Sequence, residues 1–169
     1  HLMARGMQPD RLAIVGPGQL GQGQAYGCVS GDFRLNVRAD LMRLWPDQPD
    51  HFAQWATKKI NDDPDARTDV GDFYRRRDFA TYMAEQISAF PAIAKILHHQ
   101  SLAQTITRGL KGWRITLTDG TAITAETVVI ATGNPTPEWP MKAPPADAPG
   151  LVRVPWRGDW PGQIANDAC

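Results

Sequence analysis

A string of glycines directly after a short apolar segment is the clearest candidate for chemistry in this chain. Arg11-Leu-Ala-Ile-Val15 has the composition of a buried strand, and Gly16-Pro-Gly-Gln-Leu-Gly21 follows it with the spacing G-x-G-x-x-G. Glycines at this spacing let the backbone turn tightly and bring its N–H groups against the pyrophosphate of a dinucleotide. Gly16, Gly18 and Gly21 are therefore candidate nucleotide-binding residues, and the alternative is that 16–21 is an ordinary loop.

The residues after this string do not predict the helix that such a site normally uses. Residues 22–32 contain Gly23, Gly27 and Gly31 and lack apolar residues at helical spacing. Glycine disfavours helix, and without a periodic apolar face no amphipathic helix is expected. The string thus has a strand before it and no helix after it.

Other classes of site chemistry find little support. His98 and His99 fall in an alternating segment with no carboxylate or cysteine at ligand spacing, so they are expected to be partners within a meander and no metal site is predicted. Neither Cys28 nor Cys169 has metal or redox spacing. No serine, cysteine or lysine lies in a nucleophile motif, so hydrolase chemistry is not supported and no catalytic residue is assigned.

Composition sets the broad class. The chain has 169 residues, and its 18 Lys and Arg balance its 18 Asp and Glu. A formal net charge of zero gives no reason to expect nucleic-acid or anionic-membrane partners. With no apolar run of membrane-spanning length and no signal-peptide pattern, we expect a cytoplasmic protein. Residues 1–7 are interpreted as a cloning remnant ahead of a natural start at Met7.

Two helices and an antiparallel meander are expected to carry these residues. Apolar residues at helical spacing predict helices over residues 49–60, capped by Asp47 or Gln48, and over residues 76–89. Alternation then predicts strands over residues 93–100, 102–108, 113–118 and 121–124, with a hairpin turn at Asp119-Gly120. The apolar run Thr127-Val-Val-Ile-Ala131 is typical of a strand buried in a parallel sheet.

Beyond Gly133 the composition changes. Eight of the 14 prolines lie between Asn134 and Pro161, together with Trp139, Trp156 and Trp160. Proline at this density is incompatible with regular helix or a central strand, so residues 134–169 are expected to form an extended tail.

The first strand and the Ala131-Thr-Gly133 segment resemble the FAD domain of flavoproteins with two dinucleotide-binding domains. Further segments narrow the resemblance to the bacterial FAD-NAD(P)-binding family, which is similar to flavin-dependent N-hydroxylases and FAD-dependent urate hydroxylase. In order along the chain they are Gly21-Gln-Gly-Gln-Ala-Tyr-Gly27, Leu35-Asn-Val37, Trp45-Pro-Asp-Gln-Pro-Asp-His-Phe52, Arg76-Arg-Asp-Phe-Ala-Thr-Tyr82, Gly112-Trp-Arg-Ile-Thr-Leu-Thr-Asp-Gly120 and Ala131-Thr-Gly-Asn-Pro135.

This resemblance implies FAD as cofactor, with NAD(P)H used by the complete family architecture, and it suggests further site residues. Gly23, Ala25 and Tyr26 would belong to a segment near the flavin, although Tyr26 could equally pack beneath a glycine loop. Asn36 would face the isoalloxazine, although asparagine is also common in turns. Thr132 and Gly133 would end a strand beside FAD.

The run Arg75-Arg-Arg77 allows two interpretations of its role. Its positive charge could neutralise a pyrophosphate. The alternative, which the sequence favours, is a solvated start of a helix.

The chain also departs from the family pattern. About one helix and one strand, the latter ending in the acidic residue that holds the ribose, are expected between Val15 and Gly21 but are absent. Asp32 and Asp40 lie near the expected distance, but neither ends a recognisable strand, so no ribose ligand is assigned. The NAD(P)-binding domain that follows in the family is also expected to be missing.

The sequence therefore predicts an α/β fold: a Rossmann-like FAD-binding domain, partial because its first βαβ unit is missing, with a β-meander and two helices. This domain is expected over residues 8–133, followed by the tail. The favoured function is the FAD-binding portion of a flavin-dependent, NAD(P)H-linked oxidoreductase or monooxygenase, not catalytic as this chain alone. One alternative is a cofactor-free remnant or interaction module, and another is a nucleotide-binding module that uses only residues 16–21.

Overall fold

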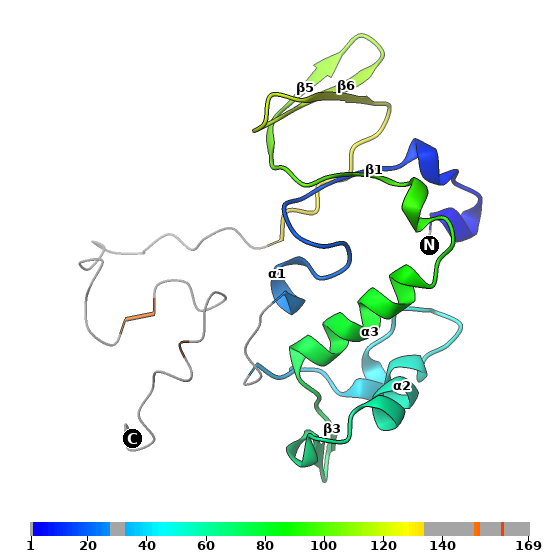
Figure 1. Cartoon of the computed structure of the whole chain (residues 1–169), viewed down its shortest axis with the longest axis vertical. Helices are drawn as coiled ribbons and strands as arrows, with labels where there is room; N and C mark the ends of the chain where they lie inside the picture. The colour runs from blue at the N-terminus through cyan, green and yellow to red at the C-terminus, as the bar shows by residue number, and fades with distance from the viewer. Residues whose placement is uncertain (1, 28–32, 134–150, 153–159, 161–169) are drawn as a thin grey trace. The chain divides into compact units, whose positions relative to one another are not determined.

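The computed structural model describes residues 2–27, 33–133, 151–152 and 160, and it contains both helices and small sheets, consistent with an α/β fold (Figure 1). The described chain divides into two compact units. One comprises His1–Leu20 and Gln86–Thr132, and the other comprises Gly21–Glu85 and Gly133–Cys169. Most of the expected proline-rich tail, both cysteines and Asp32 lie outside the described residues.

The first unit contains a two-stranded parallel sheet. Strand β1 (Ala13–Val15) pairs with β4 (Leu97–His99), with Ile14 opposite His98. The expected strand over 93–100 is therefore shorter, because the 3-10 turn η5 (Ile93–Lys95) occupies its first residues. The placement of His98 and His99 in the meander was wrong, since both belong to the strand that pairs with β1.

The meander follows as predicted. Strands β5 (Ala103–Gly109), β6 (Gly112–Leu117) and β7 (Ala122–Ala125) form an antiparallel sheet in that order. The alternation of β6 is confirmed, because Ile115 and Leu117 are buried. Gly112, the first residue of β6, has φ +135°, and a Cβ there would lie 2.5 Å from the carbonyl oxygen of Ala125. This position therefore requires glycine.

The apolar run 127–131 is not a strand, which corrects the sequence prediction. Val129 and Ile130 are 82% and 72% exposed. An apolar run becomes a buried strand only where a neighbouring strand takes up its backbone N–H and C=O groups. In the described chain the parallel sheet consists of β1 and β4 alone, so composition without a pairing partner does not produce the strand.

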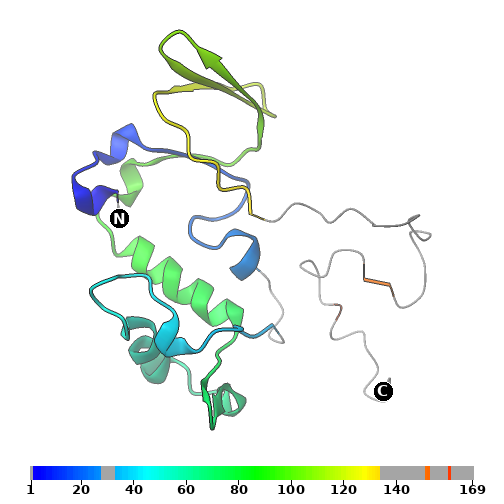
Figure 2. The ribbon, with the colours of Figure 1, turned by 180° about the vertical axis from the view of Figure 1, so that it is seen from behind.

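The second unit is built on helices α2 (His51–Lys59) and α3 (Arg76–Ser88), which confirm the two predicted helices to within a few residues. Helix α2 lies beside α3 in both ribbon views (Figures 1 and 2). Asp50, rather than Asp47 or Gln48, precedes α2, and its side chain makes no capping hydrogen bond. Shorter elements are α1 (Gly23–Tyr26), the 3-10 turns η3 (Ala39–Leu41) and η4 (Pro64–Ala66), and strands β2 (Arg67–Thr68) and β3 (Gly71–Asp72).

Aromatic rings form the core of this unit. Phe52 of α2 is completely buried, with its ring centroid 4.8 Å from that of Phe79 and 5.2 Å from that of Tyr82. The Tyr82 hydroxyl lies 2.7 Å from Nδ1 of His51, which gives this buried polar group a partner. The predicted apolar faces of the two helices therefore meet each other.

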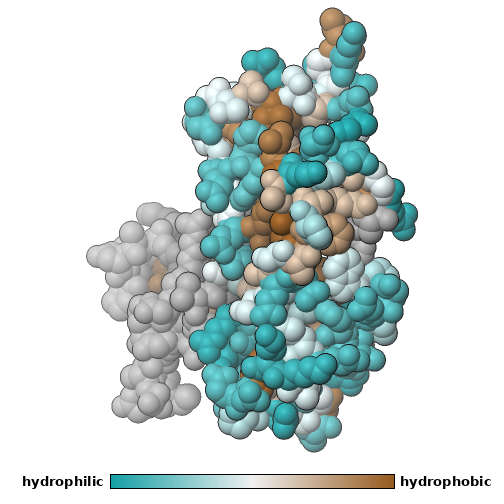
Figure 3. Space-filling view, turned by 45° about the vertical axis from the view of Figure 1, so that its right-hand side comes forward, coloured by the Kyte–Doolittle hydropathy of each residue, from teal (hydrophilic) through white to brown (hydrophobic). Residues whose placement is uncertain are grey.

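Much of the apolar surface of the first unit is exposed. Figure 3 shows brown, hydrophobic atoms between teal ones in the upper half of the view. Large exposed apolar residues of this unit include Leu97, Leu102, Leu110, Val129 and Ile130. Within the described ranges, no helix has both the length and the apolar character needed to span a membrane.

Candidate functional site

The first glycine turn leaves the parallel sheet at Gly16. Its backbone N–H donates to the carbonyl oxygen of His99 at 3.0 Å, and its carbonyl oxygen lies 3.2 Å from Nε2 of His98. A Cβ built on Gly16 or on Gly18 would have no heavy atom within 4 Å, so the surface at both positions is open. The sequence reasoning recognised this turn but missed the role of His98 in holding it.

Among the described residues that follow this turn, up to Gly27, no long helix begins. The next helix is α1, which has four residues and ends at Tyr26, with Gly27 as its C-cap. Around its start, Gly21 and Gly23 have φ of +89° and +56°, whereas Gln22 has φ −84° and ψ −50°. Alternation between right-handed and left-handed conformations turns successive backbone N–H groups toward a common concavity that suits an anion.

Arg76 connects α1 to the neighbouring segment. Its Nη1 donates to the carbonyl oxygen of Ala25 at 3.5 Å, and its Nε donates to the carbonyl oxygen of Arg34 at 3.0 Å. Tyr26 is half-buried, with its ring centroid 4.9 Å from that of Phe79, so it packs against the core of this unit. Ala25 itself is exposed.

Gly133 lies close to α1, although more than a hundred residues separate them in the sequence. It has φ +67°, and a Cβ there would lie 3.5 Å from Oε1 of Gln24. Asn36 is exposed in a bend of the same unit, next to buried Leu35. The structure thus brings Gly133 together with the segment of Gly23, Ala25 and Tyr26.

The remaining predicted residues belong to the other unit. Gly16 and Gly18 follow β1, and exposed Thr132 follows the run that is not a strand.

The arginines at the start of α3 are not simply solvated. The side chain of Arg75 is only 18% exposed, and its guanidinium lies 3.5 Å from Asp63 and 3.6 Å from Asp62. The expectation of a solvated helix start is therefore wrong for Arg75, and it is wrong for Arg76, whose guanidinium binds backbone carbonyls. The sequence analysis assigned no role to Asp63 and therefore missed that it is a partner for arginines.

Asp63 is the buried centre of this ion-pair cluster. Its side chain is completely buried and accepts hydrogen bonds from Nη1 and Nη2 of Arg34 at 3.0 and 2.8 Å. These hydrogen bonds lower the pKa of Asp63 below its ordinary value. The cluster fixes Arg34, whose carbonyl oxygen accepts from Arg76, so it acts on the loop that carries Asn36.

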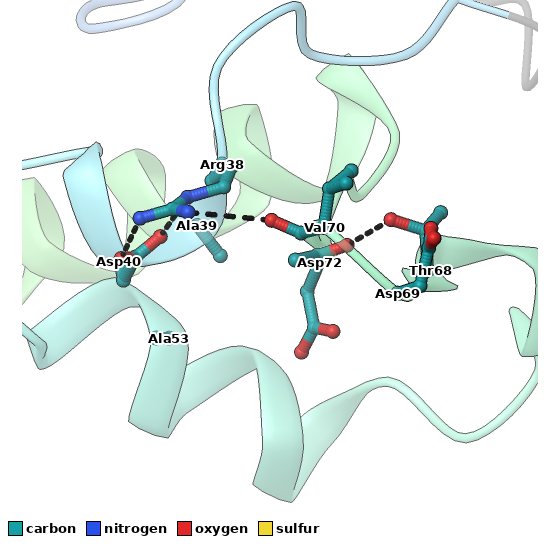
Figure 4. Close-up of a pocket in the computed structure, with 9 residues that line it drawn as sticks. Arg38, Ala39, Asp40, Ala53, Thr68, Asp69, Val70 and Asp72 are labelled. Atoms are coloured by element: carbon teal, nitrogen blue, oxygen red, sulfur yellow. Dashed lines mark hydrogen bonds and ion pairs between the residues drawn. The ribbon is translucent and has the colours of Figure 1, made fainter.

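A pocket of about 450 Å³ lies elsewhere in this unit (Figure 4). Arg38 spans it, with hydrogen bonds to Asp40 at 2.8 and 3.1 Å and to the carbonyl oxygen of Val70 at 3.3 Å. Asp69 and Asp72 also line it, but none of the residues predicted from the sequence does. Across the described part of the chain, no group of three or more His, Cys, Asp or Glu is arranged to hold a metal ion.

Comparison with protein-family models matches residues 1–135 to the family described as FAD-NAD(P)-binding. The matched range contains all nine candidate site residues and confirms the expected resemblance to the FAD-NAD(P)-binding family. No curated protein and no solved structure matches the chain.

Proposed function

Because the chain belongs to the FAD-NAD(P)-binding family, we propose that it is the FAD-binding portion of a flavin-dependent oxidoreductase or monooxygenase whose complete form uses NAD(P)H. Family membership assigns FAD and NAD(P) as cofactors. A bound flavin supplies the redox chemistry, and the protein supplies binding, orientation and electrostatics.

The observation that carries this proposal is the open backbone of the first glycine turn. Phosphates bind where backbone N–H groups can approach them without intervening side chains. Gly16 and Gly18 have free space at their Cβ positions, and Gly21 and Gly23 flank a residue of opposite handedness. Each feature, taken by itself, suits a phosphate group. We therefore propose phosphate contacts for Gly16 and Gly18 in the first unit, and for Gly21 and Gly23 in the second.

The remaining candidate residues suit the flavin end of the cofactor. Ala25, Asn36 and Thr132 are exposed, and Gly133 lies near Gln24. We propose flavin contact for Ala25, Asn36, Gly133 and the edge of Tyr26 in the second unit, and, on the family resemblance alone, for Thr132 in the first. The amide of Asn36 can donate or accept a hydrogen bond at a polar ring atom, and the small side chain of Ala25 leaves room for a planar ring.

FAD binding is tested on the purified chain by absorbance, fluorescence quenching and thermal denaturation. We expect uptake of FAD and a higher melting temperature, because a ligand at one hundred times its Kd adds about 2.7 kcal/mol to the free energy of unfolding. A chain that takes up no FAD and gains no thermal stability would contradict the proposal and favour the cofactor-free module. Binding of ADP or NAD without FAD would favour a nucleotide-binding module.

A substitution locates the binding to the glycine turn. Gly18→Val adds a side chain where the structure has open space, and Gly18 lacks a positive φ, so the fold should tolerate it. We expect the variant to lose FAD affinity at an unchanged melting temperature. Ala122→Val, on an exposed position of β7, is the matched control and should bind FAD as the wild type does.

A further inference from the structure

We infer that His98 is a positioning residue for nucleotide binding, which it serves by holding the carbonyl oxygen of Gly16 away from the phosphates. This inference rests on the proposed function, because it takes the turn of Gly16, Pro17 and Gly18 to face a phosphate. It assigns a role to a side chain that the sequence pattern suggests is only structural.

Both polar groups of Gly16 are held by β4. The N–H group donates to the backbone oxygen of His99, and the carbonyl oxygen meets the imidazole of His98. A carbonyl oxygen can only accept, so Nε2 of His98 must carry the proton and donate it. The backbone hydrogen bond belongs to the strand pairing, whereas the side-chain hydrogen bond depends on the residue type at position 98.

Pro17 makes the orientation of this carbonyl important. The peptide group between Gly16 and Pro17 has no N–H, so its carbonyl oxygen is its only strongly polar group. A carbonyl oxygen directed at a phosphate repels it, and this peptide has no donor to offset the repulsion. The hydrogen bond from His98 holds the carbonyl oxygen of Gly16 on the side of β4. The other backbone groups of the turn can then face a bound phosphate.

The parallel register explains why the side chain comes from position 98. His98 is the partner of Ile14, and Gly16 is the first residue after β1, two positions beyond Ile14, so its carbonyl oxygen comes within reach of the His98 imidazole. His98 is partly buried, so the hydrogen bond is partly shielded from water. His99 is opposite Val15, and its side chain projects from the other face, which makes it a suitable control.

The test compares FAD and ADP binding by wild type, His98→Ala, His98→Gln and the control His99→Gln. His98→Ala should raise the Kd for both ligands about threefold to tenfold, the range expected for one net hydrogen bond. His98→Gln can donate from its amide and should restore most of the affinity, and His99→Gln should bind as the wild type. If His98→Ala does not fold, His98→Leu fills the space without a donor and takes its place.

A double-mutant cycle with Pro17→Ala separates positioning from a purely structural role. The substitution restores a backbone N–H that a bound phosphate can itself orient, so loss of His98 should cost less affinity in this background. If His98 only stabilises the strand pair, then replacing it should lower the melting temperature of the unliganded protein, and its effect on affinity should show no coupling to Pro17.

Two outcomes are distinguishable. Wild type that binds neither FAD nor ADP overturns the proposed function together with the role of His98. Wild type that binds FAD while His98→Ala binds it equally overturns the role of His98 alone.

Discussion

At the scale of single residues, Asp63 shows how a carboxylate can organise a candidate site without touching it. Asp63→Asn removes the charge but keeps the size, and it leaves the guanidinium groups of Arg34 and Arg75 without their buried counter-charge. We expect the free energy of unfolding to fall by about 1.5–3 kcal/mol, the range for hydrogen bonds to charged groups. Urea denaturation measures this change, and Asp47→Asn, at an exposed position, is the control, with no effect expected.

Asp63 also predicts a direction for the pH dependence of stability. Its pKa is lowered in the folded chain by the hydrogen bonds of Arg34, so its contribution is present above the unfolded pKa, about 3.9, and is lost as the pH falls toward the folded value. Asp78 acts oppositely, because burial raises its pKa and protonation then favours the folded state. Urea denaturation at decreasing acidic pH should show the difference in free energy of unfolding between wild type and Asp63→Asn becoming smaller. A constant difference would contradict this assignment.

Residue types allowed the candidate site to be predicted only in part. The glycines and the family segments could be recognised because their backbone freedom and order are properties of the sequence. The partners of Arg34, Arg75 and Gly16 could not, because they come from residues 29, 12 and 82 positions away. Such pairs depend on tertiary packing, which leaves no local pattern.

At the scale of elements, the α2 and α3 pair should carry most of the stability of the second unit. Phe52→Ala removes a completely buried ring that contacts Phe79 and Tyr82. We expect a loss of about 3–5 kcal/mol, the usual cost of replacing a core phenylalanine by alanine. Chemical denaturation followed by tryptophan fluorescence measures it. Leu41→Ala, at a position that is 53% exposed, should change stability far less.

The helices were predictable because the spacing of their apolar residues is a property of a single element. The structure of the run 127–131 was not predictable in this way. Its composition is that of a central strand, but a strand also needs a partner, and the described parallel sheet offers it none. Arg11 and Glu126, 3.4 Å apart, form an exposed ion pair of little energetic weight, which does not replace a row of hydrogen bonds.

The exposure of this run gives a direct prediction. Val129→Lys should change the free energy of unfolding by no more than about 0.5 kcal/mol, as at an ordinary surface position, because Val129 is 82% exposed. A loss of several kcal/mol would mean that the run is buried as a strand in solution. Ile115→Lys, at a buried position of the meander, is the destabilising comparison.

At the scale of the whole molecule, the two units should differ in local stability. The second unit has a continuous aromatic and aliphatic core, whereas β1 and β4 form a sheet of two strands with three paired positions. A two-stranded sheet is marginal in water, and local opening follows the density of buried contacts. In hydrogen exchange without ligand, amides of α3 should therefore be more protected than those of β1.

Addition of FAD should change this pattern at the glycine turn. A ligand that binds only the folded state suppresses its opening, so the amide of Gly16 and its neighbours in β1 should exchange more slowly. Amides of the β5 and β6 hairpin, which carry no candidate site residue, are the internal control and should be unchanged. His98→Ala should weaken the protection at Gly16 at the same FAD concentration, because fewer molecules are then bound. Equal exchange with and without FAD would instead favour a scaffold that retains the fold of a flavoprotein without its cofactor.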